Sequence, residues 1–315
     1  MKHVLSIRDL GHDDLPRLFT LTAELKARQR ARRDQVTPLL GRTMALIFEK
    51  PSLRTRVTFE VAMVQLGGAA VYLSAQEIGL GKRESVPDIA RNLSRWVDVV
   101  GARVFSHRTL EEMAAHASVP VINALSDLEH PCQAVADFFT LWERGLDLAK
   151  LRLGWVGDGN NVCHSVLLLA ALCGTAAVVA CPPGFEPQPA ILDACRALGG
   201  RVRVTTDPRE AAEGADVIYT DTWISMGQEA DRDRRLEAFQ RYQLNETLLG
   251  FAEPGALVMH CLPAHRGEEI TDAVLDGPRS VIFDQAENRL HAQKGIILQL
   301  LGGGLRPPSE AFPQE

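Results

Sequence analysis

Short apolar segments alternate with longer amphipathic segments along most of this chain. The stretch from Pro16 to about Arg33 shows the helical pattern, because Leu18, Leu21 and Leu25 fall on one side of a helix. Strands that alternate with helices form parallel sheets whose two faces are covered by helices. With 315 residues, the chain is long enough for two such domains. We therefore predict an α/β fold of two domains, each a parallel sheet flanked by helices.

Both halves of the chain show this alternation. The expected strands are Thr43–Phe48, Ala69–Leu73, Ala102–Phe105, Val119–Ile122, Leu151–Val156, Ala176–Ala180, Val202–Thr205, Val217–Thr220, Ala256–His260 and Ser280–Phe283. The expected helices are Pro16 to about Arg33, three that begin near Arg54, Val86 and Leu110, and Gln133–Arg144, Val162–Leu172, Pro189–Leu198, Arg232–Phe239 and Asn288–Leu301. We place the domain boundary near residue 145, between domains 1–145 and 146–285. We expect the glycine- and proline-containing tail, 303–315, to be loose.

Composition excludes several classes of protein. The chain has 34 basic and 40 acidic residues and a net charge of −6, which argues against nucleic-acid binding through bulk charge. No apolar run is long enough to span a membrane, and the first residues lack the apolar segment of a signal peptide. The six cysteines form no CxxC pair. We therefore expect a cytoplasmic protein without disulfides, in which local basic clusters bind any anionic ligand.

The segment Phe48–Glu60 ends a strand and begins a helix near Arg54. A helix N-terminus carries unpaired N–H groups and a partial positive charge, so it attracts anions. Two hydroxyls and two guanidinium groups lie in the same turn, and guanidinium matches phosphate oxygens in pairs. This predicts a site for a phosphate-bearing small molecule. The structural alternative is a helix start whose arginines pair with Glu49 and Glu60.

Two further motifs follow strands in the middle of the chain. His130 and Gln133 lie at a helix start, where His130 is suited to donate a hydrogen bond or transfer a proton and Gln133 to bind an amide. The alternative is a structural histidine at a capped helix. Leu153–Val162 resembles a dinucleotide-binding turn, but Val162 replaces the third glycine. This cofactor signal is weak, and Asn161 at the helix start is instead suited to bind a carboxylate.

Polar residues also follow two later strands. In Asp221–Glu229, Asp221 is suited to accept an ammonium group, although a polar turn is the alternative. Cys261 is a candidate nucleophile, metal ligand or site-lining thiol. His130, Cys132, His260 and Cys261 suggest zinc, but their spacing lacks the paired ligands of zinc sites, so we expect no metal.

Two arginines stand out for different reasons. Arg103 lies inside an apolar strand, where a charge is costly unless it has a partner. Arg289 follows Asp284 near the start of the last helix. It is a candidate for binding a carbonyl or phosphate oxygen, and a surface arginine is the alternative.

Taken together, these motifs resemble those of ornithine carbamoyltransferases from Phe48 to Leu300, in the family's order. The motifs that carry the resemblance are His-Pro-Cys-Gln (130–133), Asp-Thr-Trp-Ile-Ser-Met-Gly-Gln-Glu (221–229), His-Cys-Leu-Pro (260–263) and Ala-Glu-Asn-Arg (286–289). The resemblance implies a first domain that binds carbamoyl phosphate, a second that binds ornithine, and a helix, 286–302, that returns to the first. It also implies trimers, alone or stacked, with a neighbour's loop near Gln76–Ser85 entering the site, and no metal or organic cofactor.

The resemblance also assigns roles to individual residues. The expected phosphate contacts are Ser52, Leu53, Arg54 and Thr55; the phosphate and carbamoyl contacts are Arg103 and the motif His130, Pro131, Cys132 and Gln133; the amino-acid contacts are Asn161, Asp221, Ser225 and Met226; and the residues lining the reacting centre are Cys261, Leu262 and Arg289. Of these, Arg54, Arg103, His130, Asp221, Cys261 and Arg289 are the expected catalytic residues.

Two positions depart from the family pattern. Leu53 stands where the ornithine branch usually has threonine, so we expect loss of a side-chain contact but not of function. Gly79 stands where bacterial members often have glutamine in the interface loop.

The expected reaction is carbamoyl transfer from carbamoyl phosphate to L-ornithine, giving citrulline and phosphate. Putrescine or an acylated ornithine is an alternative acceptor. Alternatives of another class are a nicotinamide-dependent dehydrogenase and a non-catalytic binding protein.

Overall fold

The computed structural model describes residues 1–31, 37–225 and 227–302. Contacts divide the chain into two units. The first comprises Met1–Asp127 and the chain from Arg289, and the second comprises Leu128–Asn288. The expected tail, 303–315, lies outside the described residues.

The first unit is built on a four-stranded parallel sheet in the order β2-β1-β3-β4. Its strands are β1 (Thr43–Phe48), β2 (Ala69–Ser74), β3 (Val99–Arg103) and β4 (Val121–Leu125). Its helices are η1 (Ile7–Asp9), α1 (Asp14–Arg30), α2 (Leu53–Gln65), α3 (Ala75–Ile78), α4 (Val86–Trp96) and α5 (His107–His116). The strand order reverses between β1 and β3, and such a switch point is where parallel sheets bind ligands.

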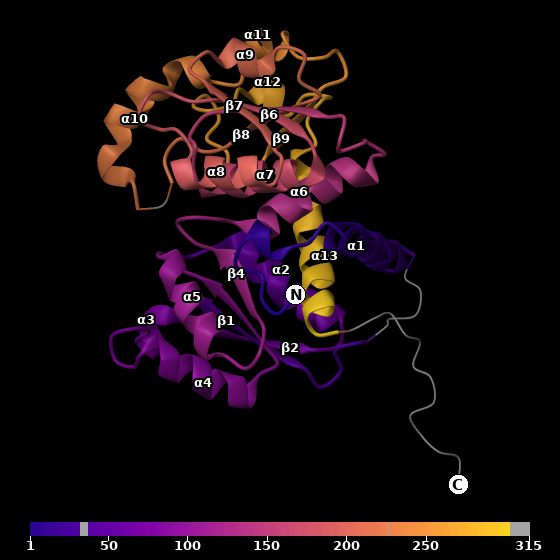
Figure 1. Ribbon diagram of the computed structural model, residues 1–315, viewed down its shortest axis with the longest axis vertical. Coiled ribbons are helices and arrows are strands. Elements are labelled where there is room, and N and C mark those ends of the chain that lie inside the picture. Colours follow the sequence, from indigo (N-terminus) through magenta and orange to yellow (C-terminus); the bar gives the residue numbers. More distant parts are fainter. Residues whose placement is uncertain (32–36, 226, 303–315) are drawn as a thin grey trace. The chain divides into compact units, whose positions relative to one another are not determined.

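Helices cover both faces of this sheet (Figure 1). On one face, alternate residues of β1 and β3, such as Ile47 and Ala102, pack with Leu93 of α4 and Leu110 of α5 in one apolar cluster. In Figure 1, α2 lies on the other side of the sheet from α4 and α5. The later part of α13 (Ile282–Leu300) packs against α1, where a Cβ on Gly295 would lie 2.4 Å from Thr22 Oγ1. This close approach explains the glycine in the middle of the helix.

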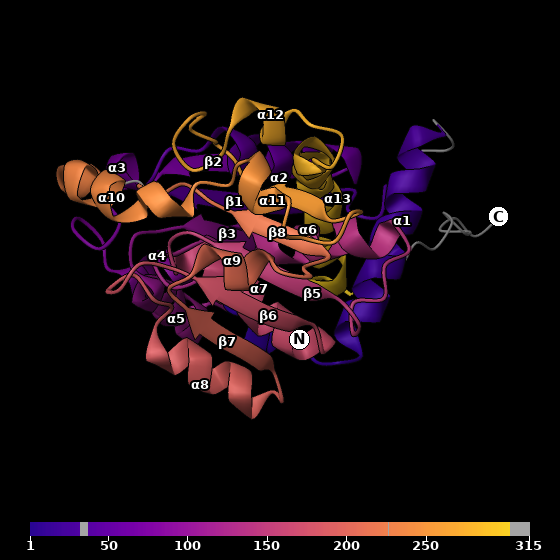
Figure 2. The same ribbon diagram turned by 90° about the horizontal axis from the view of Figure 1, so that it is seen from above.

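The second unit is built on a five-stranded parallel sheet in the order β7-β6-β5-β8-β9. Its strands are β5 (Arg152–Val156), β6 (Ala176–Ala180), β7 (Arg201–Thr205), β8 (Val217–Thr220) and β9 (Leu257–His260). Its helices are α6 (Pro131–Glu143), α7 (Asn161–Cys173), α8 (Pro189–Ala197), α9 (Pro208–Ala212), η2 (Glu229–Asp231), α10 (Arg232–Phe239), η3 (Gln240–Tyr242), α11 (Glu246–Leu249), α12 (Asp272–Leu275) and the first turns of α13. Figures 1 and 2 show α7 and α8 on one face of the sheet and α9, α11 and α12 on the other. The switch point lies between β5 and β8.

The predicted fold class is confirmed. Two strands are shifted, since β3 covers Val99–Arg103 in place of the expected Ala102–Phe105 and β4 covers Val121–Leu125 in place of Val119–Ile122.

One expected strand does not form. Ser280–Phe283, expected as a strand, is not one. Ser280 forms an isolated bridge with Val258, and α13 begins two residues later at Ile282, earlier than the expected Asn288. The Val258 N–H donates to the Arg279 carbonyl, and the Val281 N–H donates to the Val258 carbonyl. The segment therefore pairs with β9 at a single residue before α13 begins.

The division between the units also differs from the expected boundary near residue 145. It falls between Asp127 and Leu128, because α6 packs against α7 and is grouped with the second unit. At the other end, α13 belongs to both units, and the division falls between Asn288 and Arg289. None of the described helices is long and apolar enough to cross a lipid bilayer.

Candidate active site

The expected phosphate site lies at the N-terminus of α2, directly after β1. The Ser52 side chain caps the helix by accepting a hydrogen bond from the Thr55 N–H at 3.3 Å. Arg289 from α13 donates to Thr55 Oγ1 at 3.3 Å, and both residues are almost fully buried. Arg54 is partly buried in the same turn, whereas Leu53 is 74% exposed. A guanidinium group and a helix N-terminus thus meet in one corner of the first unit, as an anion site requires.

Arg103 ends β3 and pairs in register with Phe48 at the end of β1. It is buried, and its carbonyl accepts a hydrogen bond from the Glu49 N–H at 2.8 Å. Arg103 and the start of α2 therefore lie at the carboxyl ends of β3 and β1, the two strands that flank the switch point of the first sheet.

The alternative in which acids neutralise the arginines holds for one pair. Arg56 forms an ion pair with Glu60 at 3.0 Å, and its guanidinium lies 3.7 Å from the centre of the Tyr72 ring. The Glu49 carboxylate instead accepts a hydrogen bond from the backbone N–H of Phe105 at 2.6 Å.

The His-Pro-Cys-Gln motif forms the start of α6. His130 is buried at the N-cap position, and its N–H donates to Ser165 Oγ at 2.9 Å. Pro131 begins the helix, where the missing N–H costs nothing, and Cys132 is fully buried. Gln133 donates its side-chain amide to Asp137 Oδ1 at 2.7 Å. Because a carboxylate only accepts hydrogen bonds, Gln133 must turn its nitrogen, not its oxygen, toward Asp137.

Asp137 is the centre of a buried network that reaches β9. It also accepts hydrogen bonds from the Tyr219 hydroxyl at 2.9 Å and from Gln285 Nε2 at 2.7 Å. Burial, followed by the nearby Asp137 charge, raises the pKa of Tyr219 well above its usual value, so this hydroxyl stays a donor. The Gln285 oxygen accepts from the backbone N–H of His260 at 3.0 Å. The network therefore links the Gln133 side chain to the strand end that precedes Cys261.

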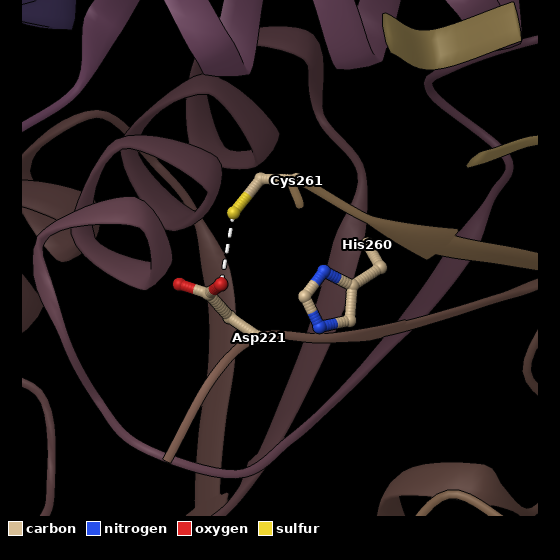
Figure 3. A group of neighbouring side chains, drawn as sticks. All are labelled: Asp221, His260 and Cys261. Carbon is tan, nitrogen blue, oxygen red and sulfur yellow. Dashed lines mark hydrogen bonds between the residues drawn. The ribbon is translucent and has the colours of Figure 1, made fainter. Parts of the chain in front are cut away.

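The second cluster of expected site residues lies at the carboxyl ends of β5, β8 and β9. The Cys261 thiol donates to Asp221 Oδ1 at 2.8 Å, as Figure 3 shows. Asn160 Nδ2 donates to the other carboxylate oxygen at 2.7 Å, and the Thr222 N–H donates to Oδ1 at 2.8 Å. The second unit thus presents a buried, hydrogen-bonded carboxylate beside a thiol at its switch point.

Asp221, His260 and Cys261 bring their donor atoms within 4.8 Å of one another, a spacing that a metal ion also needs. Both ring nitrogens of the fully buried His260 are engaged, however. Nδ1 accepts from the Leu262 N–H at 2.9 Å, and Nε2 lies 3.1 Å from Glu269 Oε1. A nitrogen that accepts a hydrogen bond has no lone pair left for a metal, so the hydrogen bonds of His260 do not fit a metal ligand.

The turn at Gly157–Gly159 does not fit a dinucleotide. The backbone of 185–187 crosses it, and the Gly159 N–H donates to the Phe185 carbonyl at 2.9 Å. A Cβ on Gly159 would lie only 2.3 Å from Pro187 N. The close backbone approach that Gly159 permits is therefore made by this segment of the protein. The Asn160 side chain instead caps α7, which begins at the expected site residue Asn161.

The segment after Asp221 is anchored at Trp223. Arg235 donates to the Trp223 carbonyl at 2.7 Å and to Asp158 at 2.9 Å. Burial raises the pKa of Asp158 to about 6, and the Arg235 charge opposes that rise. Further along, the Ser225 N–H donates to the Gln228 side chain at 3.1 Å. The expected site residue Met226 lies outside the described residues.

Sequence reasoning missed several residues of these clusters, among them Asn160, Asp137 and Glu269. Asn160 gave a usable signal, because asparagine directly before a helix favours the N-cap position. Asp137 also gave one, because it lies four residues after Gln133 and so on the same helix face. Glu269 gave none, because its contact with His260 depends on the tertiary fold.

Replacing Asn160 by alanine removes both the α7 cap and a donor to Asp221. We expect the free energy of unfolding to fall by about 1–2 kcal/mol, the usual cost of losing an N-cap. A urea titration followed by circular dichroism measures this. An unchanged midpoint and slope would show that the cap contributes nothing.

Comparisons with known proteins identify the family. Residues 2–143 match the aspartate/ornithine carbamoyltransferase carbamoyl-P binding domain, and residues 149–300 match the Asp/Orn binding domain of the same family. An ornithine carbamoyltransferase from Archaeoglobus fulgidus is 52% identical over 96% of this chain and 98% of its own length. A solved structure of ornithine carbamoyltransferase from Pyrococcus furiosus superposes with a TM-score of 0.92 at 45% identity, covering 96% of this chain and 97% of that one. The chain therefore belongs to the aspartate/ornithine carbamoyltransferase family.

Proposed function

We propose that this chain transfers the carbamoyl group of carbamoyl phosphate to the side-chain amine of L-ornithine, giving L-citrulline and phosphate. The observation that carries this proposal is the buried Asp221 carboxylate at the switch point of the second unit, with the Cys261 thiol 2.8 Å away. A carboxylate in this position is suited to hold an ammonium group. The relatives described above are ornithine carbamoyltransferases that match over almost their full lengths, which supports the same donor and acceptor.

The residues of the first unit would bind the donor. Ser52 and Leu53 offer N–H groups at the α2 start, and Arg54, Arg103 and Arg289 supply positive charge for the phosphate. Thr55 would contribute its hydroxyl, because its N–H already donates to Ser52 Oγ. Leu53 needs no side-chain contact in this role, because a backbone N–H is sufficient. His130 and Gln133 of the second unit would bind the carbamoyl group. No cofactor is needed, because carbamoyl phosphate carries its own leaving group.

The residues of the second unit would bind and orient the acceptor. Asn161, Ser225 and Met226 would hold the α-amino acid group, and Asp221 would hold the amine beside Cys261 and Leu262. The side-chain ammonium of ornithine first releases one proton to solvent. The neutral amine nitrogen then attacks the carbamoyl carbon, and a C–N bond forms. The tetrahedral oxyanion then collapses, the C–O bond to phosphate breaks, and the departing phosphate takes up the amine proton. Positioning the two substrates and stabilising the oxyanion account for the rate enhancement.

Acceptor specificity is tested with a panel of amines at fixed carbamoyl phosphate. Because Ser225-Met226-Gly227 resembles the ornithine branch, we expect kcat/KM for L-ornithine to exceed that for putrescine or N-acetyl-ornithine by at least about 100-fold, as expected when buried polar groups must be matched. Colorimetric detection of the ureido product measures all three. A higher kcat/KM for putrescine or N-acetyl-ornithine would contradict the proposed acceptor.

We also propose that the protein is a homotrimer, alone or stacked, that acts in arginine metabolism in the cytoplasm. Apolar side chains on α2 and the edge strand β2 support an oligomer, since Leu53, Val64 and Val71 are 74%, 68% and 48% exposed in the single chain. Light scattering after size-exclusion chromatography is expected to give three times, or a multiple of three times, the 34.5 kDa chain mass. A monomer at micromolar concentration would contradict this.

A further inference from the structure

Glu269 is a fully buried carboxylate in the loop that follows β9. Its Oε1 accepts a hydrogen bond from the His265 N–H at 2.5 Å and lies 3.1 Å from His260 Nε2. Its Oε2 lies 3.5 Å from His265 Nδ1. A buried carboxylate is costly unless nearby donors compensate it, so two histidines converging on one acid call for an explanation.

The contact with His260 determines which nitrogen of that ring carries the proton. His260 Nδ1 accepts a hydrogen bond from the Leu262 N–H at 2.9 Å, so Nδ1 is unprotonated. The ring proton is then on Nε2, the nitrogen that faces Glu269. Glu269 therefore selects the tautomer of His260 that can hold the Leu262 backbone.

The backbone of Leu262 adopts an unfavourable conformation. Its φ of 59° lies in the left-handed region, which costs a leucine roughly 1–2 kcal/mol. Conformations of this kind persist only where surrounding contacts enforce them, and they gather at functional sites. The hydrogen bond to His260 is such a contact, and it acts on the residue that directly follows Cys261.

A second chain of contacts runs from Glu269 to Asp221. His265 Nδ1 lies 3.1 Å from Thr222 Oγ1, and the Thr222 N–H donates to Asp221 Oδ1 at 2.8 Å. The Cys261 thiol bonds to the same oxygen. Glu269 is thus connected to Asp221 through His265 and Thr222. It is connected to Cys261 through His260 and the backbone of Leu262.

We propose that Glu269 is a positioning residue, which acts through His260 to hold Leu262 in its left-handed conformation and so keeps the Cys261 thiol on Asp221. The catalytic consequence rests on the proposed function, because Cys261 and Leu262 would line the reacting centre only in that reaction. The geometric part depends on the fold of the second unit alone.

The kinetic test compares Glu269→Ala with Glu269→Gln. The alanine variant is expected to lower kcat roughly 10- to 100-fold, the usual cost of misplacing reacting groups through a lost support. Its KM for carbamoyl phosphate is expected to change by less than about threefold, because the phosphate contacts lie in the first unit. The glutamine variant keeps an oxygen that accepts from His260 and His265, so it is expected to stay within about fivefold of the parent.

Glu210→Gln is the matched control. This carboxylate lies on α9 in the same unit, pairs with Arg203 and has 43% of its side chain exposed, so the same change of charge is expected to leave kcat unaltered. If Glu210→Gln and Glu269→Ala lowered kcat equally, or if Glu269→Gln lost as much as Glu269→Ala, the proposal would be overturned.

A second readout needs no catalysis. Iodoacetamide alkylation of Cys261 is followed by mass spectrometry of its peptide, in the absence of substrates. In Glu269→Ala the thiol is released from Asp221, and its alkylation is expected to accelerate about tenfold, whereas Glu269→Gln keeps the parent rate. An unchanged rate in Glu269→Ala would overturn the geometric proposal. A parent protein that makes no citrulline but shows this pattern would contradict the proposed function alone.

A third pair of variants tests the same step if Glu269→Ala fails to fold. The oxygen of His260→Asn lies near the place of Nδ1 and accepts from the Leu262 N–H without help from Glu269, whereas His260→Ala accepts nothing. We expect the asparagine variant to keep at least about tenfold more kcat than the alanine variant. Equal activities would overturn the role of the Leu262 contact.

Discussion

Replacing Arg54 by alanine is expected to lower kcat roughly 1,000-fold, because the variant loses a preorganised cation where charge develops on the phosphate and the oxyanion. The fold is expected to persist, since Arg54 is only partly buried and the α2 cap depends on Ser52 and Thr55. Steady-state citrulline formation measures the loss, and thermal melting checks the fold.

Arg91→Ala is the control for this variant. Arg91 carries the same charge in the same unit, but it lies on α4 with 57% of its side chain exposed and pairs with Asp88 at 2.9 Å. Exposed ion pairs of this kind contribute at most about 1 kcal/mol to stability. Because Arg91 is not an expected site residue either, the activity of Arg91→Ala is expected to stay near that of the parent. Near-normal turnover by Arg54→Ala would refute the assignment of the α2 start as the phosphate site.

Asp221→Asn is expected to lower kcat/KM for ornithine roughly 100- to 1,000-fold, because the amine loses a charged partner in a buried site. The amide cannot replace the carboxylate, since its nitrogen would face a donor in either orientation: Asn160 Nδ2 on one side or the Thr222 N–H on the other. Asn160 cannot turn to compensate without giving up the α7 cap. Kinetics at saturating carbamoyl phosphate isolate the effect on the acceptor.

Asp193→Asn is the matched control in the same unit. Asp193 lies on α8 with 70% of its side chain exposed, so the same substitution there is expected to leave kcat/KM unchanged. Should Asp221→Asn retain more than about a tenth of the parent kcat/KM, Asp221 would not be the residue that holds the amine.

Much of the fold followed from the sequence. Thr43–Phe48, Ala176–Ala180 and Val217–Thr220 were predicted to the residue, because each is a short apolar run that is followed by polar or proline residues. Ser280–Phe283 is equally short and partly apolar, and a run of that length does not distinguish a strand from the first turn of a helix. The helices α3, α9, α11 and α12 were missed because four or five residues show no helical periodicity.

The candidate site was predictable where its chemistry follows a strand end. Asp221 and Cys261 come directly after β8 and β9, which are neighbours in the sheet, and their contact follows from that order. Glu269 was not predictable, because seven residues of loop separate it from Cys261 and only the tertiary fold returns it to His260. The convergence of the phosphate and amino-acid corners into one crevice stays a prediction.

The most direct test of the central claim follows the bond that the enzyme would make. Purified protein is incubated with 13C-labelled carbamoyl phosphate and L-ornithine labelled with 15N at the side-chain amine, and the product is examined by carbon NMR. We predict a new ureido carbon signal split by one-bond coupling to nitrogen, formed together with an equal amount of inorganic phosphate. Release of phosphate without that coupled signal, or no turnover of either substrate, would contradict the account.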